Sequence, residues 1–312
     1  MNKKFSHYLL IVLITMIATP SIASVISQSN NISDILAFRS SERINETSRF
    51  KNKYKRSKKI KSRIENKIYS RNEIVPPFDN EVNPNHNYPI GLFIADNGSV
   101  KKICTASVIN SKNGNIGLTA AHCLLDDDGN PWNLSSLSFS PGYDNGTNGP
   151  LGAIPVVDTA MPHEYLINPN KYDYALVRFE FNQGGATLQE YTGALGWRFD
   201  IGNREPTSVY GYPDNGNFEN CVHDGEHLCK WQGTTVKREN IYIIVNLTAG
   251  SGASGGPLIS QYDAKTNLGY AYAVIRGYLD GYNVSIGSIW DEIVFSDLLL
   301  RITPKYNYVL GH

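Results

Sequence analysis

The sequence lacks the features that mark several classes of protein. Its 312 residues contain only four cysteines, which excludes a disulfide-dense scaffold. They show no collagen-like glycine period, no coiled-coil pattern and no internal repeat. With 27 glycines, 15 prolines and 41% hydrophobic residues, the chain is typical of a turn-rich globular protein with one large domain or two smaller ones.

The chain also lacks a net charge, because 29 Lys and Arg balance 29 Asp and Glu. This balance hides two parts of opposite sign. Residues 1–73 contain 15 basic and 5 acidic residues, which leaves 14 basic and 24 acidic residues for residues 74–312. We expect the acidic part to bind neither nucleic acid nor an anionic membrane.

The only long apolar run lies near the start of the chain. Lys3 and Lys4 precede an apolar run over residues 8–18, and Pro20 and the small residues of 21–23 follow it. This pattern predicts a secretory signal peptide at residues 1–23, since the run is shorter than the roughly 20 residues that span a bilayer. We therefore expect a secreted protein, extracellular or in transit through the periplasm, without membrane attachment once the signal is removed. In such an oxidising compartment the cysteines should form disulfides.

Residues 24–73 form a basic segment with eleven Lys or Arg between positions 49 and 71 and few aromatic residues. Such a composition does not support a core of its own. The segment fits a solvated linker, a patch that binds nucleic acid or heparin, or a removable pro-segment that lies against the acidic body. The matched opposite charges favour the pro-segment, and we place its processing between Arg71 and Ile74.

From Ile74 onward, short β-branched and aromatic runs alternate with Gly, Asn, Asp and Pro. These runs are residues 90–94, 153–157, 174–179, 208–210, 241–247 and 270–275. Short strands with frequent turns predict an all-β sandwich or barrel. Residues 290–301 differ, because their apolar side chains recur at helical spacing and predict a C-terminal surface helix.

Two short motifs supply a candidate base and its partner. In Leu118-Thr-Ala-Ala-His-Cys123, small residues and a cysteine surround His122, and this setting can fix the orientation that a general base needs. Asp173 heads an apolar strand, where its carboxylate can accept a hydrogen bond from an imidazole and set its tautomer. Taken alone, His122 fits an ordinary half-buried histidine, and Asp173 fits a turn residue.

A third motif, Ala249-Gly-Ser-Gly-Ala-Ser-Gly-Gly-Pro-Leu258, is the most specific. Its glycines let the backbone turn tightly around Ser254 and aim the amides of Gly252 and Ser254 at one point, as an oxyanion hole requires. The alternative is a flexible Gly/Ser linker. The strand-like residues 241–247 before the motif and the apolar residues 257–259 after it argue against a linker.

In combination, the motifs resemble those of the chymotrypsin-like serine peptidases, whose chain order is His, Asp, Ser. The resemblance covers most of residues 74–300. It implies two six-stranded antiparallel β-barrels, with a boundary near residue 185. It also implies that Ser254 is the nucleophile, His122 the general base and acid, and Asp173 the orienting carboxylate.

Within that family, the chain is similar to the secreted bacterial branch that includes the V8-like glutamyl endopeptidases. Residues 74–82 and 88–91 resemble the mature start of that branch, and Val209-Tyr-Gly-Tyr-Pro213 resembles its Gly-Tyr-Pro element. We therefore assign residues 74–312 to the peptidase domain. Animal digestive enzymes of the family carry Asp before the catalytic serine, where it pairs with the new N-terminus. Ala253 stands at that position here and excludes activation by this ion pair.

The cysteines suggest two pairs. The resemblance implies a disulfide between Cys104 and Cys123. Four cysteines allow three connectivities, and spacing favours a local pair between Cys221 and Cys229. The alternative at the second pair is a metal site completed by two histidines, His223 and His227. An oxidising compartment and a spacing unlike that of zinc sites argue against it, and we expect no metal and no cofactor.

The substrate pocket has a weaker signature. In the resemblance, the residue six before the nucleophile sets the pocket floor, and here it is Thr248. The acid behind a trypsin-like preference for Arg or Lys is therefore absent. The strand after the nucleophile carries Arg276, whose planar guanidinium suits a carboxylate. Thr248 and Arg276 together predict a preference for Glu, and the alternative is that Arg276 points to solvent.

The sequence therefore predicts a secreted serine endopeptidase, made as a precursor, that hydrolyses peptide bonds through a Ser-His-Asp triad and an acyl-enzyme. We expect protein or peptide substrates and the chain's own pro-segment as partners, and a monomer. Two alternatives use the same scaffold. One is a protease-fold binding protein without catalysis, and the other is an esterase.

Overall fold

The computed structural model describes residues 73–80, 88–279 and 281–304. The predicted signal peptide, residues 1–23, and the predicted pro-segment up to residue 72 lie outside the described residues. All described residues belong to one unit of the chain, Thr47–His312. In this described part, no helix is long and apolar enough to cross a membrane.

Six strands form a first barrel in which every neighbouring pair is antiparallel. In chain order they are β2 (Ile90–Asp96), β3 (Lys101–Val108), β4 (Ile116–Thr119), β5 (Leu137–Pro141), β6 (Ile154–Ala160) and β7 (Ala175–Phe179). Around the barrel the order is β2-β3-β4-β7-β6-β5, and β5 pairs with β2 to close it. The buried rings of Phe139 and Phe179 stack in the core, with their centroids 4.5 Å apart.

Six further strands form the second barrel. They are β9 (Arg204–Gly211), β10 (Cys229–Arg238), β11 (Ile241–Val245), β12 (Pro257–Asp263), β13 (Leu268–Leu279) and β14 (Val284–Ile289). Their order is β13-β12-β9-β10-β11-β14, and antiparallel pairing of β13 with β14 closes the barrel. Two short strands extend the sheet beyond it: β8 (Gly196–Arg198) runs parallel to β13, and β1 (Ile74–Val75) pairs antiparallel with β8.

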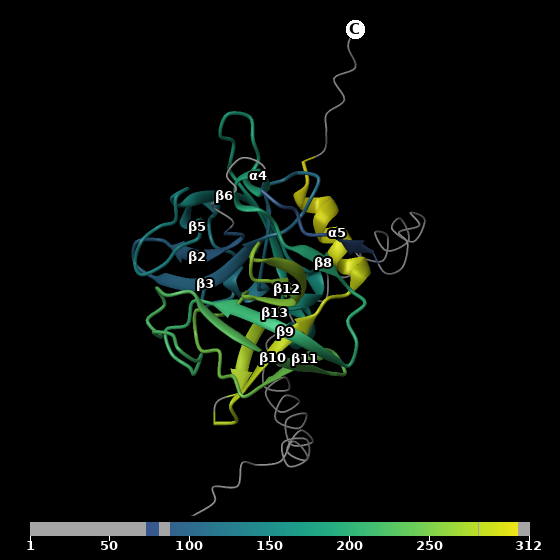
Figure 1. The fold of residues 1–312 in the computed structure, drawn as a ribbon. Coiled ribbons are helices and arrows are strands. Elements are labelled where there is room, and N and C mark those ends of the chain that lie inside the picture. The colour runs from purple at the N-terminus through teal and green to yellow at the C-terminus, as the bar shows by residue number, and fades with distance from the viewer. Residues whose placement is uncertain (1–72, 81–87, 280, 305–312) are drawn as a thin grey trace, which may run out of the picture. The chain divides into compact units, whose positions relative to one another are not determined.

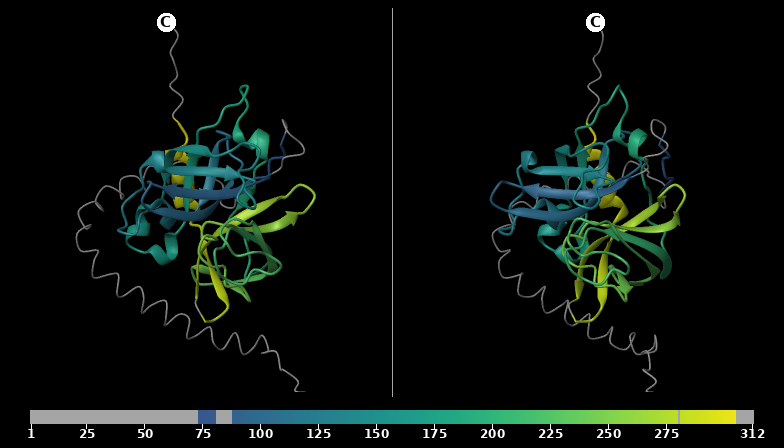
Figure 2. Two further views of the ribbon diagram at one scale, coloured as in Figure 1. Left: turned by 90° about the vertical axis from the view of Figure 1, so that its left-hand side faces the viewer. Right: turned by 60° about the vertical axis from the view of Figure 1, so that its left-hand side comes forward.

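Short helical turns connect the strands, and one longer helix follows them. The turns are η3 (Ala121–Leu124), η4 (Leu134–Ser136), η5 (His163–Leu166), α3 (Pro169–Tyr172) and α4 (Leu188–Thr192). The longer helix is α5 (Glu292–Ile302), and the side chain of Asp291 caps its first turn by accepting from the amides of Ile293 and Val294. Helix α5 packs against β6 and β7 of the first barrel; it is the yellow helix in Figure 1 and Figure 2.

The predicted fold class, two six-stranded antiparallel barrels with a C-terminal helix, is confirmed. Each of the six runs predicted as strands coincides or overlaps with an observed strand, and the helix predicted at 290–301 is α5. Figure 2 shows the first barrel in blue and the second in green to yellow. The boundary near residue 185 stays a prediction, and it falls between the end of β7 at Phe179 and the start of β9 at Arg204.

Candidate active site

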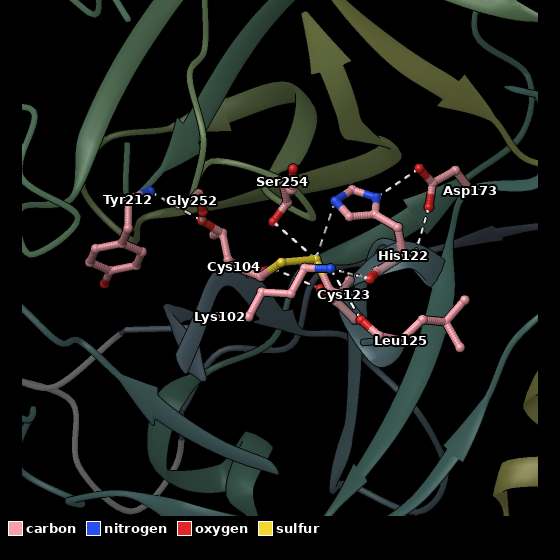
Figure 3. The surroundings of a disulfide bond; sticks show 11 residues. Lys102, Cys104, His122, Cys123, Leu125, Asp173, Tyr212, Gly252 and Ser254 are labelled. Carbon is pink, nitrogen blue, oxygen red and sulfur yellow. Dashed lines mark hydrogen bonds and ion pairs between the residues drawn. A yellow bond between two sulfur atoms is a disulfide. The ribbon is translucent and has the colours of Figure 1, made fainter. Parts of the chain in front are cut away.

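His122 lies on η3, the turn that follows β4, and two residues of β3 hold this turn in place. Cys123 is bonded to Cys104 of β3, with 6.2 Å between the Cα atoms. Lys102, also on β3, donates from Nζ to the carbonyl oxygens of His122 and Leu125 at 3.0 and 3.1 Å. Figure 3 shows Lys102 reaching the turn beside the disulfide. The backbone that carries the imidazole is therefore fixed by a covalent link and a cation.

Asp173 meets His122 at two atoms. Asp173 lies between α3 and β7, and its side chain is 6% exposed. Its Oδ2 is 2.8 Å from the ring Nδ1, and its Oδ1 accepts the backbone N–H of His122 at 3.0 Å. Because a carboxylate only accepts, the contact selects the neutral tautomer that has its proton on Nδ1 and a lone pair on Nε2. The side chain of His122 is 26% exposed, so this free nitrogen can act as a base.

Ser254 lies on the glycine-rich turn between β11 and β12. Gly252 and Gly255 on either side have φ of +83°, a conformation that favours glycine. Neither position has room for a side chain. A Cβ on Gly252 would lie 2.1 Å from the carbonyl oxygen of Tyr212, and a Cβ on Gly255 would lie 2.3 Å from that of Thr105. The turn therefore fits closely against both barrels.

The carbonyl oxygens of residues 251–254 all accept hydrogen bonds of 2.8–3.0 Å. For Ser251, Gly252, Ala253 and Ser254, the donors are Asp214 N, Thr105 Oγ1, Gly256 N and Thr105 N respectively. In a trans peptide the N–H points away from the C=O. The amides of Gly252 and Ser254 are thus directed away from these donors, and neither donates to another described residue.

Ser254 and His122 lie on one side of the Cys104–Cys123 disulfide (Figure 3). The sulfur of Cys123 is 3.8 Å from both the carbonyl oxygen of Ser254 and the Nε2 of His122. No hydrogen bond within the described ranges joins Ser254 Oγ to this Nε2. Such bonds are often long without substrate and shorten when it binds. The structure thus brings the three motifs of the sequence to one place.

The two residues predicted for the substrate pocket lie on different segments. The backbone of Thr248 is paired with Asn217: its N–H donates to Asn217 Oδ1 at 2.6 Å, and its oxygen accepts from Asn217 N at 2.9 Å. Arg276 donates from Nη1 to the carbonyl oxygen of Asn170, three residues before Asp173. Burial lowers the pKa of this guanidinium, against the attraction of Asp173. Arg276 is half-buried, and its guanidinium is directed at the α3 segment. It does not point to solvent, as the alternative interpretation had it.

The four cysteines form the two disulfides named from the sequence, Cys104–Cys123 and Cys221–Cys229. A bonded sulfur is not a thiolate ligand. The histidines of the rejected metal site are also engaged. His223 Nε2 is 2.9 Å from the carbonyl oxygen of Phe218, and His227 Nδ1 is 2.8 Å from a carboxylate oxygen of Asp224. In the described part of the chain, the residues that could gather around a metal are Cys104, His122 and Cys123, and two of them share the disulfide.

Sequence reasoning missed Lys102 and Thr105. They stand two residues before and one residue after Cys104. Nothing in the local pattern marks them, because Lys102 follows another lysine and Thr105 is an ordinary β-branched strand residue. The available signal was their closeness to a cysteine expected to bond beside His122. Burial lowers the pKa of Lys102, while Asp127 and Asp173 oppose this shift.

Comparison with known proteins gives a family and several similar folds. Residues 78–277 match the trypsin family. A thermostable serine protease from an extremophilic microorganism is similar in structure, with a TM-score of 0.58 and 23% identity over 69% of this chain and 97% of that chain. Protease Anisep from Arthrobacter nicotinovorans has a TM-score of 0.56 and 24% identity, over 72% of this chain and 96% of that chain. A Glu endopeptidase has a TM-score of 0.53 and 16% identity, over 74% of this chain and 96% of that chain.

No curated protein matches the chain. The likenesses to solved structures show a shared fold, and the family match covers more than half of the sequence. The chain belongs to the trypsin family of serine proteases.

Proposed function

We propose that this chain is a serine endopeptidase in which Ser254 is the nucleophile, His122 the general base and acid, and Asp173 the orienting carboxylate. The observation that carries the proposal is the double contact of Asp173 with His122, at 2.8 Å to the ring and 3.0 Å to the backbone. This contact fixes both the tautomer and the position of the imidazole. Orientation of the base is what a nucleophilic serine requires.

The mechanism follows from these contacts. Ser254 Oγ bonds to the carbonyl carbon of the scissile peptide while its proton passes to His122 Nε2. The amides of Gly252 and Ser254 hold the oxyanion that forms. The C–N bond then breaks, the leaving amine takes the proton from Nε2, and an acyl-enzyme remains. Water attacks this ester with the same base, which returns the proton to Ser254 and releases the acid.

We further propose that the enzyme is secreted as a precursor. Residues 1–23 would direct export, and residues 24–73 would form the basic pro-segment, removed between Arg71 and Ile74. Both disulfides of the described region suit an oxidising compartment. N-terminal sequencing of the secreted form tests the processing site, and a start well outside this window would contradict it.

The preference for Glu rests on Thr248 and Arg276. Because the guanidinium of Arg276 is engaged with Asn170, a substrate carboxylate would have to approach it beside that contact. A peptide library tests the preference directly. Cleavage after Glu is expected to exceed cleavage after Leu or Lys, and equal cleavage after all three would contradict both the preference and the V8-like assignment.

The first test of function is the mass of the intact, processed protein after treatment with a fluorophosphonate. This reagent phosphonylates an activated serine with loss of fluoride. One adduct is expected on the wild type and none on Ser254→Ala. No adduct on folded, processed protein would contradict the proposal and favour a binding protein without catalysis. Turnover of an ester but not of the matching peptide would instead identify an esterase.

A further inference from the structure

Thr105 connects the first barrel to the residues around the nucleophile. It lies on β3, is fully buried, and reaches residues 251–254, here called the nucleophile loop, through two groups. Its backbone N–H donates to the carbonyl oxygen of Ser254 at 2.8 Å. Its Oγ1 donates to the carbonyl oxygen of Gly252 at 3.0 Å. One residue thus holds two carbonyls of the loop from the opposite barrel.

The hydroxyl of Thr105 is used as both donor and acceptor. While it donates to Gly252, it accepts the N–H of Tyr212 at 3.1 Å. Tyr212 directly follows β9 of the second barrel. Its carbonyl oxygen is the atom that leaves no room for a Cβ on Gly252. The hydroxyl therefore joins β3, the segment after β9 and the nucleophile loop at a single atom.

The loop has no charged residue to hold it in place. Ala253, immediately before the serine, is apolar and fully buried. Gly252 is the residue in the loop with the widest choice of backbone conformation, and nothing but the Thr105 hydroxyl binds its carbonyl among the described residues. If that carbonyl turned, the peptide between Gly252 and Ala253 would turn with it, and the amides on either side would move.

We propose that Thr105 is a positioning residue that sets the nucleophile loop in the conformation that presents the amides of Gly252 and Ser254 to the reacting carbonyl. This inference rests on the proposed endopeptidase function. The hydroxyl does not touch substrate. It acts by fixing the Gly252 carbonyl. A neutral hydrogen bond, and not an ion pair, thus holds the loop.

The test is Thr105→Val, which keeps the shape of the side chain and removes the hydroxyl. Gly252 O and Tyr212 N then lose a buried partner. We expect kcat on a peptide substrate to fall at least about 10-fold, because oxyanion donors act mainly in the transition state. KM should stay close to that of the wild type. Thr105→Ser retains the hydroxyl and should restore most of kcat.

Thr235→Val is the matched control. Thr235 is also fully buried, and its hydroxyl lies 2.8 Å from the hydroxyl of Tyr272 inside the second barrel. The same change at this position removes a buried hydroxyl without touching the nucleophile loop. We expect it to lower stability and to leave kcat unchanged.

Hydrogen exchange supplies a readout that does not depend on catalysis. The amide of Tyr212, which donates to the Thr105 hydroxyl, should exchange faster in Thr105→Val than in the wild type or in Thr235→Val. A wild type that forms no fluorophosphonate adduct would refute the proposed endopeptidase function. Hydrogen exchange would then be the only test of whether Thr105 positions the loop. Unchanged kcat in an active Thr105→Val enzyme, or unchanged exchange of the Tyr212 amide, would overturn the inference.

Discussion

The carboxylate of Asp173 binds His122 through both of its oxygens, one at the ring Nδ1 and one at the backbone N–H. The two bonds differ in what they control. The ring contact selects the tautomer with a proton on Nδ1, and the backbone contact fixes the turn from which the ring projects. A change that alters only the first can therefore be separated from one that disturbs both.

Asp173→Asn is such a change. An amide of similar shape still offers an oxygen to the backbone of His122, but its NH₂ group facing Nδ1 favours the tautomer with the proton on Nε2. We expect kcat to fall by about 10⁴-fold with the fold intact. Asp158→Asn is the control, since Asp158 pairs with Arg178 at 3.3 Å on the same barrel. Steady-state kinetics and thermal unfolding of both variants check this, and a loss of less than about 10-fold in Asp173→Asn would speak against the assigned role.

Gly252 and Gly98 provide a matched pair for the nucleophile loop. Their φ angles are +83° and +84°, so a side chain meets a similar backbone strain at each, about 1–2 kcal/mol. Only Gly252 lacks space, with Tyr212 O at 2.1 Å from the position of a Cβ, whereas nothing lies within 4 Å at Gly98. Gly252→Ala should lose at least about 100-fold in kcat/KM and Gly98→Ala should not. Equal activities would show that the loop tolerates displacement.

Lys102 is expected to stabilise the turn that carries His122. Lys102→Met keeps the apolar stem and removes the two hydrogen bonds to the carbonyls of His122 and Leu125, which should lower the free energy of unfolding by about 1–3 kcal/mol. Lys101→Met removes the same charge from the exposed neighbouring position and should change it by less than about 0.5 kcal/mol. Urea unfolding of both variants measures the difference. Equal midpoints would show that Lys102 does not stabilise this turn.

Buried tyrosines predict a loss of stability at alkaline pH. Burial raises the pKa of Tyr174, Tyr210, Tyr212, Tyr242 and Tyr272 well above the ordinary value of 10.0. The folded state therefore keeps their protons where the unfolded state loses them. Their contribution is fully present below about pH 10 and falls as the pH rises further, by up to about 1.4 kcal/mol per pH unit for each tyrosine.

Urea unfolding between pH 8 and pH 11.5, followed with tyrosinate absorbance, measures this dependence. The absorbance of the folded protein should stay below that of the unfolded protein at pH 11. Full ionisation of all tyrosines near pH 10 in a protein that remains folded would contradict the prediction.

Local patterns in the sequence were sufficient for most of the fold. The runs at 90–94 and 270–275 have the length and β-branched content of strands, and both lie within longer strands of the barrels. The parallel pairing of β8 with β13 was not predictable in this way. Strand β8 has three residues, too few for a periodic pattern, and its partner lies more than seventy residues further along the chain.

The candidate site divides in the same manner. Ser254, His122 and Asp173 stand in motifs whose residue types carry chemistry, so the sequence alone predicted them as candidates, and the structure brings their motifs together. Thr105 and Lys102 act through what they contact, and those contacts join residues that no local pattern relates. Arg276 shows the reverse case. Its charge was visible in the sequence, but its direction toward Asn170 depends on where α3 packs.

The bond between Thr105 and Gly252 joins residues 147 positions apart in the chain. Forming this bond requires the closure of a long loop, which costs conformational entropy. During synthesis, the first barrel emerges before the nucleophile loop exists. A chain that ends before residue 251 therefore lacks the partner of the Thr105 hydroxyl, and β3 is synthesised well before its contact with the nucleophile loop can form.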